Sequence, residues 1–96
     1  MSLKKTLDAL PVRIILALDR PRYKLEIMKI ASYAYGSFAY LSNILKEFEE
    51  EGIVKINRSG RRTYCELTEK GKRIREYLLE IKRLVGEGFE GQVQEK

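Results

Sequence analysis

The first eighteen residues carry apolar side chains at helical intervals. The side chains recur in steps of four, three and four residues, at Leu3, Leu7, Leu10 and Ile14. This spacing places them on one face of a helix. Proline is best tolerated in the first turn of a helix, so Pro11 predicts a firm helix from Pro11 to Leu18 after a short helical arm. The sequence Asp19-Arg20-Pro21-Arg22 is typical of a turn and ends this helix.

Two further helices are expected before Gly52. Apolar positions after Lys24 predict a short second helix that includes Ala31. A third helix carries its apolar side chains on one side of a helical wheel, at Phe38, Leu41, Ile44, Leu45 and Phe48. The side chains on the rest of this helix are short and polar. Gly52 predicts the end of this helix, because glycine adopts the left-handed conformation at little cost.

A β-hairpin and a last helix complete the pattern. Within Ile53 to Arg58, apolar and polar residues alternate after the first residue, and they alternate again from Thr63 to Leu67, with a basic tip between the two strands. Thr68 is expected to cap the helix that follows. That helix has apolar residues at steps of four, three and four, and we expect it to end at Gly86 and Gly88.

The predicted order is three helices, a hairpin and a long helix, which is an α+β fold that is mostly α. Two helices joined by a tight turn and followed by a basic hairpin make a winged helix-turn-helix. We expect residues 1–85 to form this domain, with the N-terminal arm and the last helix used for dimerisation. Residues 86–96 are rich in Gly and Glu and are expected to be a flexible tail.

Two motifs carry a resemblance to a known family. The first is a spacing of apolar and small residues at Ile30, Ala31, Leu41, Ile44, Leu45, Phe48, Gly52, Ile53 and Val54. The second is Leu67-Thr68-Glu69-Lys70-Gly71, where the wing would end. From about Pro11 to Val85, the chain resembles the small winged-helix transcription regulators of bacteria and archaea, of the MarR, ArsR and PadR kind. The resemblance implies a homodimer that presents two recognition helices to DNA half-sites.

The composition argues against catalysis and metal binding. The 96 residues include no histidine and one cysteine, Cys65. The chain therefore lacks the commonest general base and metal ligand, and one cysteine makes neither an intrachain disulfide nor a CxxC zinc site. We expect no enzymatic activity, no metal and no cofactor. Cys65 is interpreted as a small apolar residue on the inner face of the hairpin, with redox sensing as the alternative.

Positive charge is segregated along the sequence. Nineteen Lys and Arg against fourteen Asp and Glu give a formal net charge of +5 and a pI of about 9.4. Basic residues predominate from Arg20 to Lys46 and from Lys55 to Arg62, whereas acids gather from Glu47 to Glu51 and in the tail. A segregated positive face favours phosphate binding, so double-stranded DNA is the expected partner. No export signal and no membrane-spanning run is visible, and we expect a cytoplasmic protein.

The candidate DNA contacts fall into three groups. The recognition helix offers residues that could reach base edges, namely Ser37, Tyr40, Ser42, Asn43 and Lys46. The wing offers cations for phosphates or a narrow minor groove, namely Lys55, Arg58, Arg61 and Arg62. Three cations precede or begin the second helix and would face the DNA backbone, namely Arg20, Arg22 and Lys24.

An apolar stripe on the arm and the last helix predicts a homodimer interface. Its members are Leu3, Leu7, Leu10, Ile74, Leu78, Ile81 and Val85. The leading function is a homodimeric, sequence-specific DNA-binding regulator, most simply a repressor. Two alternatives stay open: a partition-type or architectural protein that coats an extended DNA site, and a winged-helix module that binds another protein. The sequence leaves a small-molecule effector undetermined.

Overall fold

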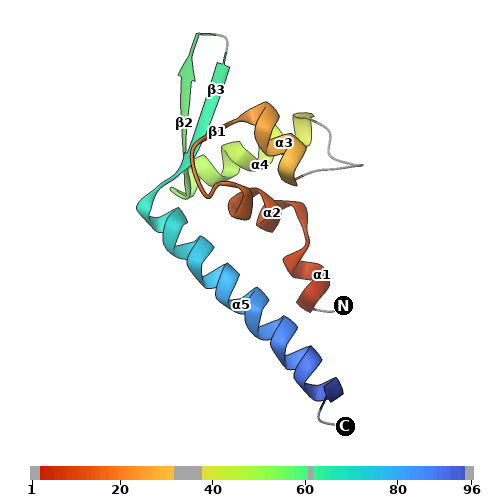
Figure 1. The fold of residues 1–96 in the computed structure, drawn as a ribbon. Helices are drawn as coiled ribbons and strands as arrows, with labels where there is room; N and C mark the ends of the chain where they lie inside the picture. The colour runs from red at the N-terminus through yellow and green to blue at the C-terminus, as the bar shows by residue number, and fades with distance from the viewer. Residues whose placement is uncertain (1–2, 32–37, 61, 95–96) are drawn as a thin grey trace.

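The part of the chain that the structure describes forms eight helices and strands of one small α+β fold. The computed structural model describes residues 3–31, 38–60 and 62–94. In chain order the elements are α1 (Leu3–Leu7), α2 (Leu10–Ala17), β1 (Arg22–Tyr23), α3 (Lys24–Ala31), α4 (Phe38–Glu50), β2 (Val54–Ser59), β3 (Arg62–Leu67) and α5 (Glu69–Gln94). Figure 1 shows α3 and α4 beside the β2–β3 hairpin, with α1 and α2 between them and the long α5. The helical arm, the three following helices, the hairpin and the last helix were all predicted from the sequence.

The core lies between the helices and one face of the sheet. Its most deeply buried side chains come from five different elements: Ile14, Ile27, Leu41, Leu45, Val54 and Cys65. Leu41 and Leu45 belong to the apolar face predicted for the third helix. Cys65 lies on the inner face of the hairpin, as the alternation along β3 predicts. Each buried aliphatic side chain contributes about 1.5–3 kcal/mol by leaving water.

Gly52 ends α4 through a Schellman motif. Its φ of 77° is left-handed. The Gly52 amide donates to the Glu49 carbonyl at 3.1 Å, and the Ile53 amide donates to the Phe48 carbonyl at 2.8 Å. These two bonds satisfy carbonyls that the last turn of a helix would otherwise leave unpaired. The motif turns the chain directly into β2.

Thr68 caps α5 and fastens it to the end of α4. Its Oγ1 accepts the Gly71 amide at 3.1 Å, which is the N-cap bond predicted from the sequence. The same hydroxyl donates to the Gly52 carbonyl at 2.6 Å, and the Thr68 amide donates to the Ile53 carbonyl at 3.0 Å. Gly71 is buried directly against that Ile53 carbonyl. The junction therefore leaves no room for a larger residue at position 71.

The sheet contains one strand that the sequence analysis missed. Its order is β1-β3-β2, with both pairings antiparallel. The two residues of β1 pair with β3, so Arg22 lies opposite Cys65 and Tyr23 lies opposite Tyr64. A two-residue strand is too short for an alternating pattern, and its partner is about forty positions away in sequence. The segment we interpreted as a turn therefore also supplies a sheet edge.

The last helix extends further than predicted. It runs for 26 residues to Gln94, so the prediction that Gly86 and Gly88 end it is wrong, and the expected flexible tail is helical over most of its length. Glycine costs about 1 kcal/mol inside a helix, but extending an existing helix is far easier than starting one. Over the described residues, no helix is long and apolar enough to cross a membrane.

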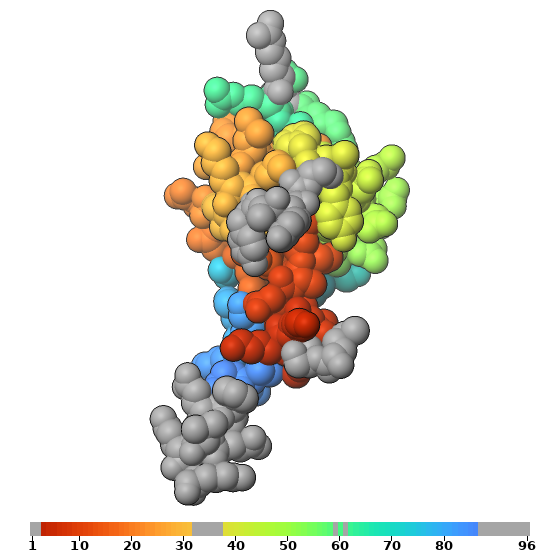
Figure 2. All heavy atoms as spheres, turned by 90° about the vertical axis from the view of Figure 1, so that its right-hand side faces the viewer, coloured from red at the N-terminus to blue at the C-terminus, as the bar shows by residue number. Residues whose placement is uncertain are grey.

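Most of the predicted dimer stripe packs within the chain. Leu7 is buried, and Leu10, Ile74 and Leu78 pack against the core or line its edge. Arg75 Nε donates to the Leu16 carbonyl at 3.2 Å and so holds α5 against α2. Figure 2 shows α1 packed over the middle of α5. The spacing identified the apolar face correctly, but spacing alone does not say which surface covers it.

Candidate nucleic-acid interface

The outer side of α4 carries some of the predicted base-contacting residues. Asn43 and Lys46 are exposed, and Tyr40 is 51% exposed. Ser42 is half-buried, and its hydroxyl accepts a hydrogen bond from Lys24 Nζ at 3.2 Å. Residues two apart on a helix are separated by about 200°, so Tyr40 and Ser42 lie on opposite flanks. Asn43 and Lys46 lie between these two flanks on the outer side of the helix, and Ser37 lies outside the described residues.

The predicted wing cations differ in their surroundings. Lys55 and Arg62 are exposed, and Arg61 lies outside the described residues. Arg58 turns back toward the helices, where its guanidinium bonds both carboxylate oxygens of Glu49 at 3.3 and 3.4 Å. This pair joins the hairpin to the last turns of α4. Glu49 was not predicted to have this role, because two residues nine apart in sequence give no local signal.

Arg22 is held within the fold and is not available as the DNA contact that the sequence suggested. Its Nε donates to the Ala17 carbonyl at 2.8 Å, and its Nη2 bonds Asp19 Oδ1 at 3.0 Å. The side chain is only 14% exposed. The guanidinium holds the pKa of Asp19 below its usual value. Arg22 therefore fixes the turn between α2 and β1, while its neighbour Arg20 is exposed.

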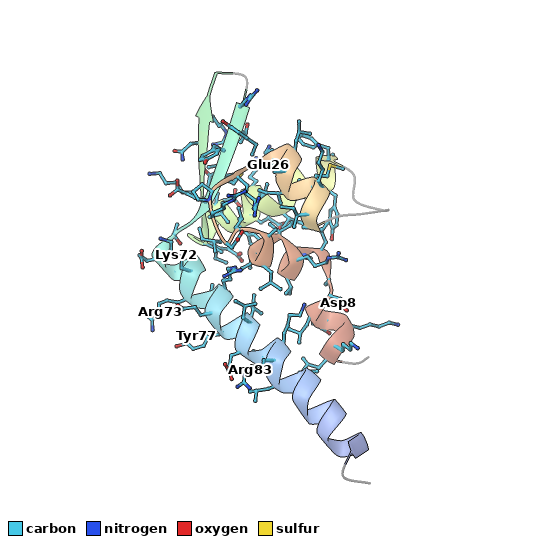
Figure 3. All side chains as sticks on the ribbon, viewed as in Figure 1. Asp8, Glu26, Lys72, Arg73, Tyr77 and Arg83 are labelled. Carbon is cyan, nitrogen blue, oxygen red and sulfur yellow. The ribbon has the colours of Figure 1, made fainter. Side chains whose placement is uncertain are left out.

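Lys24 and Arg62 line a common cleft between the hairpin and the first turns of α3 and α4. The cavity has a volume of about 530 Å³, and Phe38 also lines it. Lys24 Nζ lies 5.6 Å from the centre of the Phe38 ring. Glu26 accepts the Tyr23 amide at 2.9 Å, so this acid caps α3. Figure 3 labels Glu26 at this end of the helix. The cleft thus combines two cations with aromatic walls.

Two tyrosines on the sheet were missed by the sequence analysis. Tyr23 and Tyr64 are paired across β1 and β3, and their ring centres lie 4.8 Å apart with an interplanar angle of 62°. The guanidinium of Arg62 lies 5.1 Å from the centre of the Tyr23 ring. The alternation along β3 could have shown that Tyr64 faces away from Cys65 and the core. The position of Tyr23 could not be found without the β1 pairing.

Cys65 is not an accessible thiol in this fold. Cys65 is fully buried, with 0% of its surface exposed. Burial raises the pKa of the thiol from 9.0 to about 11, and the nearby cations Lys24 and Arg58 only partly offset this effect. A thiolate is the reactive form of cysteine, so the surroundings favour the packing interpretation over redox sensing.

One side of α5 carries exposed apolar residues that are not covered within the chain. Tyr77 is 62% exposed, Ile81 39% and Leu84 53%. The spacing of four and three residues places these side chains on one stripe. Figure 3 shows Tyr77 on the side of α5 that faces away from α1 and α2. Within the predicted stripe, Leu3 is also exposed and Val85 is half-buried.

Several solved structures are similar in fold to this chain. The fold resembles that of AF1382 from Archaeoglobus fulgidus. The chain and AF1382 share 25% sequence identity with a TM-score of 0.68, over 78% of this chain and 86% of AF1382. The diamide-treated YodB from B. subtilis matches at 23% identity and a TM-score of 0.63, over 91% of this chain and 94% of YodB. No family model and no curated protein matches the chain.

Proposed function

We propose that the protein is a winged helix-turn-helix regulator that binds double-stranded DNA in a sequence-specific manner. In this proposal α3 and α4 form the helix-turn-helix and the β2–β3 hairpin forms the wing. The observation that carries it is the exposed polar side of α4 beside a basic hairpin, which the Arg58–Glu49 pair holds next to that helix. An α-helix fits the major groove, and a hairpin beside it can follow the phosphates.

Each side chain has a distinct task in this proposal. The Asn43 amide can pair with an adenine edge through two hydrogen bonds, which contributes about 1–3 kcal/mol of discrimination. Lys46 and the hairpin cations supply contacts to phosphates. Lys24 stays near its Ser42 partner and faces the backbone at the beginning of α3. Arg20 is exposed and is kept as a weaker backbone contact.

The duplex interface is tested by separating affinity from specificity. Replacing both Arg61 and Arg62 by alanine should weaken binding to every duplex and flatten the slope of log affinity against log salt by about 0.9 per lost phosphate contact. Asn43→Ala should instead reduce the preference for the selected site at about one base pair. The measurement is a gel-shift titration at several salt concentrations, with a site selected from random DNA.

A charge-matched control uses the opposite end of the fold. Replacing Lys4 and Lys5 on α1 by alanine also removes two positive charges, but far from the hairpin (Figure 1). That variant should keep the salt slope of the wild type. Equal weakening in both double variants would show that net charge alone explains the effect and would reject the assigned interface.

A homodimer completes the proposal, with the contact moved to the exposed stripe of α5. Packing Tyr77, Ile81 and Leu84 against the same residues of a second copy would bury apolar surface that the chain itself leaves in water. Leu84→Glu should convert the dimer to a monomer in sedimentation equilibrium at micromolar concentration. Leu79→Glu is the matched control, because Leu79 is also exposed but lies on a different side of the helix. A wild-type monomer, or a Leu84→Glu dimer, would contradict this contact.

Protein binding is the second candidate function. The observation in its favour is a set of exposed apolar side chains on α3 and α4, namely Leu25, Ile30, Phe38 and Tyr40. Absence of duplex binding by the folded protein at low salt would make this candidate the leading one.

A partition-type role differs from a repressor in the length of the DNA footprint. A short protected site supports regulation, and cooperative spreading along the DNA supports coating.

A further inference from the structure

The outer face of the sheet carries two tyrosines that the duplex proposal does not use. Side chains alternate between the two faces of a strand. Val54, Ile56, Cys65 and Leu67 point into the core. Asn57, Tyr64 and Tyr23 therefore share the opposite face, and the register places them side by side across β2, β3 and β1. Arg62, two residues before Tyr64, lies on the same face. We call these four residues the tyrosine platform.

The platform forms a shallow cavity. Tyr23, Asn57, Arg62 and Tyr64 are the residues that line a volume of about 300 Å³. This volume is at the lower end of the range of small-molecule pockets, about 300–1,000 Å³. The larger cavity of about 530 Å³ also includes Tyr23 and Arg62, together with Lys24. Two cations therefore stand next to the aromatic rings. Two acids lie nearby: Glu66 accepts a hydrogen bond from Asn57 Nδ2 at 3.5 Å, and Glu26, which lines the larger cavity, accepts the Tyr23 amide.

The exposed face of Tyr23 already holds a planar cation. The Arg62 guanidinium lies over this ring at 5.1 Å, and Arg62 itself is exposed. Guanidinium groups and nucleobases stack on tyrosine in the same way. Arg62 is long and on the surface, so it can leave the ring to bind a phosphate while a base takes its place.

We propose that the tyrosine platform binds unpaired nucleotides of a single-stranded nucleic acid. One base stacks on Tyr23 against the edge of Tyr64, the Asn57 amide reaches the base edge, and Arg62 and Lys24 bind the flanking phosphates. Aromatic rings beside cations are the arrangement that single-strand-binding surfaces use. The two tyrosines lie on the sheet face opposite to the one that packs on α4, whereas Arg62 and Lys24 are shared with the proposed duplex interface.

The test compares strands with and without bases. The probes are a fluorescein-labelled oligothymidylate of about 15 nucleotides, near the upper end of the usual site size, and an abasic strand of the same length. Fluorescence anisotropy at fixed salt should give binding to the thymidylate at least about fivefold tighter than to the abasic strand. Equal affinities for the two strands would overturn the proposal, and this comparison needs only the wild-type protein.

Variants then assign the effect to the platform. Tyr23→Leu should weaken binding to the thymidylate by about five- to a hundredfold and leave the abasic strand unchanged. Tyr23→Phe keeps the ring and should retain binding, and Tyr40→Leu removes an exposed ring from α4 as the matched control. Thermal unfolding monitored by circular dichroism verifies that each variant is folded. A folded Tyr23→Leu variant with unchanged affinity, or a loss of equal size in Tyr40→Leu, would reject the site.

A blunt duplex separates this inference from the duplex proposal. Asn43→Ala should affect a selected duplex and not the single strand, whereas Tyr23→Leu should do the reverse. A failure of sequence-specific duplex binding would therefore leave the single-strand binding by the tyrosine platform unaffected. Repeating the titration with an oligouridylate of the same length distinguishes a DNA strand from an RNA strand as the source of the unpaired nucleotides.

Discussion

Gly71→Ala is expected to lower the free energy of unfolding by about 2–3 kcal/mol. A Cβ at this position would overlap the Ile53 carbonyl oxygen and lie 3.1 Å from Leu67 Cδ2. The carbonyl cannot move away easily, because it accepts the Thr68 amide at 3.0 Å. The substitution therefore forces apart the junction of α4, β2 and α5. Urea unfolding followed by circular dichroism measures the change.

Gly86→Ala provides the matched control for this prediction. Gly86 is also in α5, but among the described residues no atom beyond its chain neighbours and the helix's own backbone lies within 4 Å of the place where its Cβ would be. Alanine there should raise the free energy of unfolding by about 0.5–1 kcal/mol, which is the helix-propensity difference. The two variants make the same chemical change with opposite expected signs. A similar small gain in both would show that position 71 tolerates a side chain and that the junction is not closely packed.

The second large effect is a loss of stability at high pH that depends on Cys65. The pKa of this thiol is about 11 in the fold, against 9.0 as its ordinary value, because the side chain is buried. The unfolded chain therefore ionises first as the pH rises. The stabilisation is complete below pH 9 and is lost between pH 9 and 11, by up to about 3 kcal/mol for a difference of two pKa units.

Cys65→Ala isolates this effect from other titrations. The variant is less stable at neutral pH because it leaves a small cavity, but it has no thiol to ionise. The difference in unfolding free energy between wild type and variant should shrink by about 2–3 kcal/mol from pH 8 to pH 11. A constant difference over this range would mean that the thiol is accessible to water. Slow modification of the native thiol by a water-soluble disulfide reagent is the corresponding kinetic result.

The sequence predicted well those features that short-range chemistry determines. The apolar face of α4 follows from helical spacing, and Gly52 and Thr68 act at helix ends through bonds to residues next to them in the chain. Each depends on groups within about five positions of each other, or on one residue type with a strong conformational preference. For the same reason both boundaries of α2 were predicted to within one residue, and α3 begins at Lys24 as expected.

Long-range pairing explains most of what the sequence analysis missed. The β1 strand forms by antiparallel pairing with β3, which places Tyr23 opposite Tyr64. The sequence offered both Arg22 and Arg58 as DNA contacts. In the fold, Arg22 donates to the Ala17 carbonyl and Arg58 pairs with the Glu49 carboxylate. The candidate site shows the same limit: composition identified the basic hairpin, but only the register places Asn57, Tyr64 and Tyr23 in a row.

The Arg58–Glu49 pair affects how measurements on any polyanion complex should be interpreted. One hairpin cation is already bound to a carboxylate before a partner arrives, and Arg58 is 61% exposed, so dissolved ions weaken this pair as well. Rising salt then weakens the phosphate contacts while reducing the cost of releasing Arg58. The two effects oppose each other in one titration. A count of phosphates taken from the salt slope would therefore fall short of the true number by a fraction of one contact, and Glu49→Gln would restore that fraction.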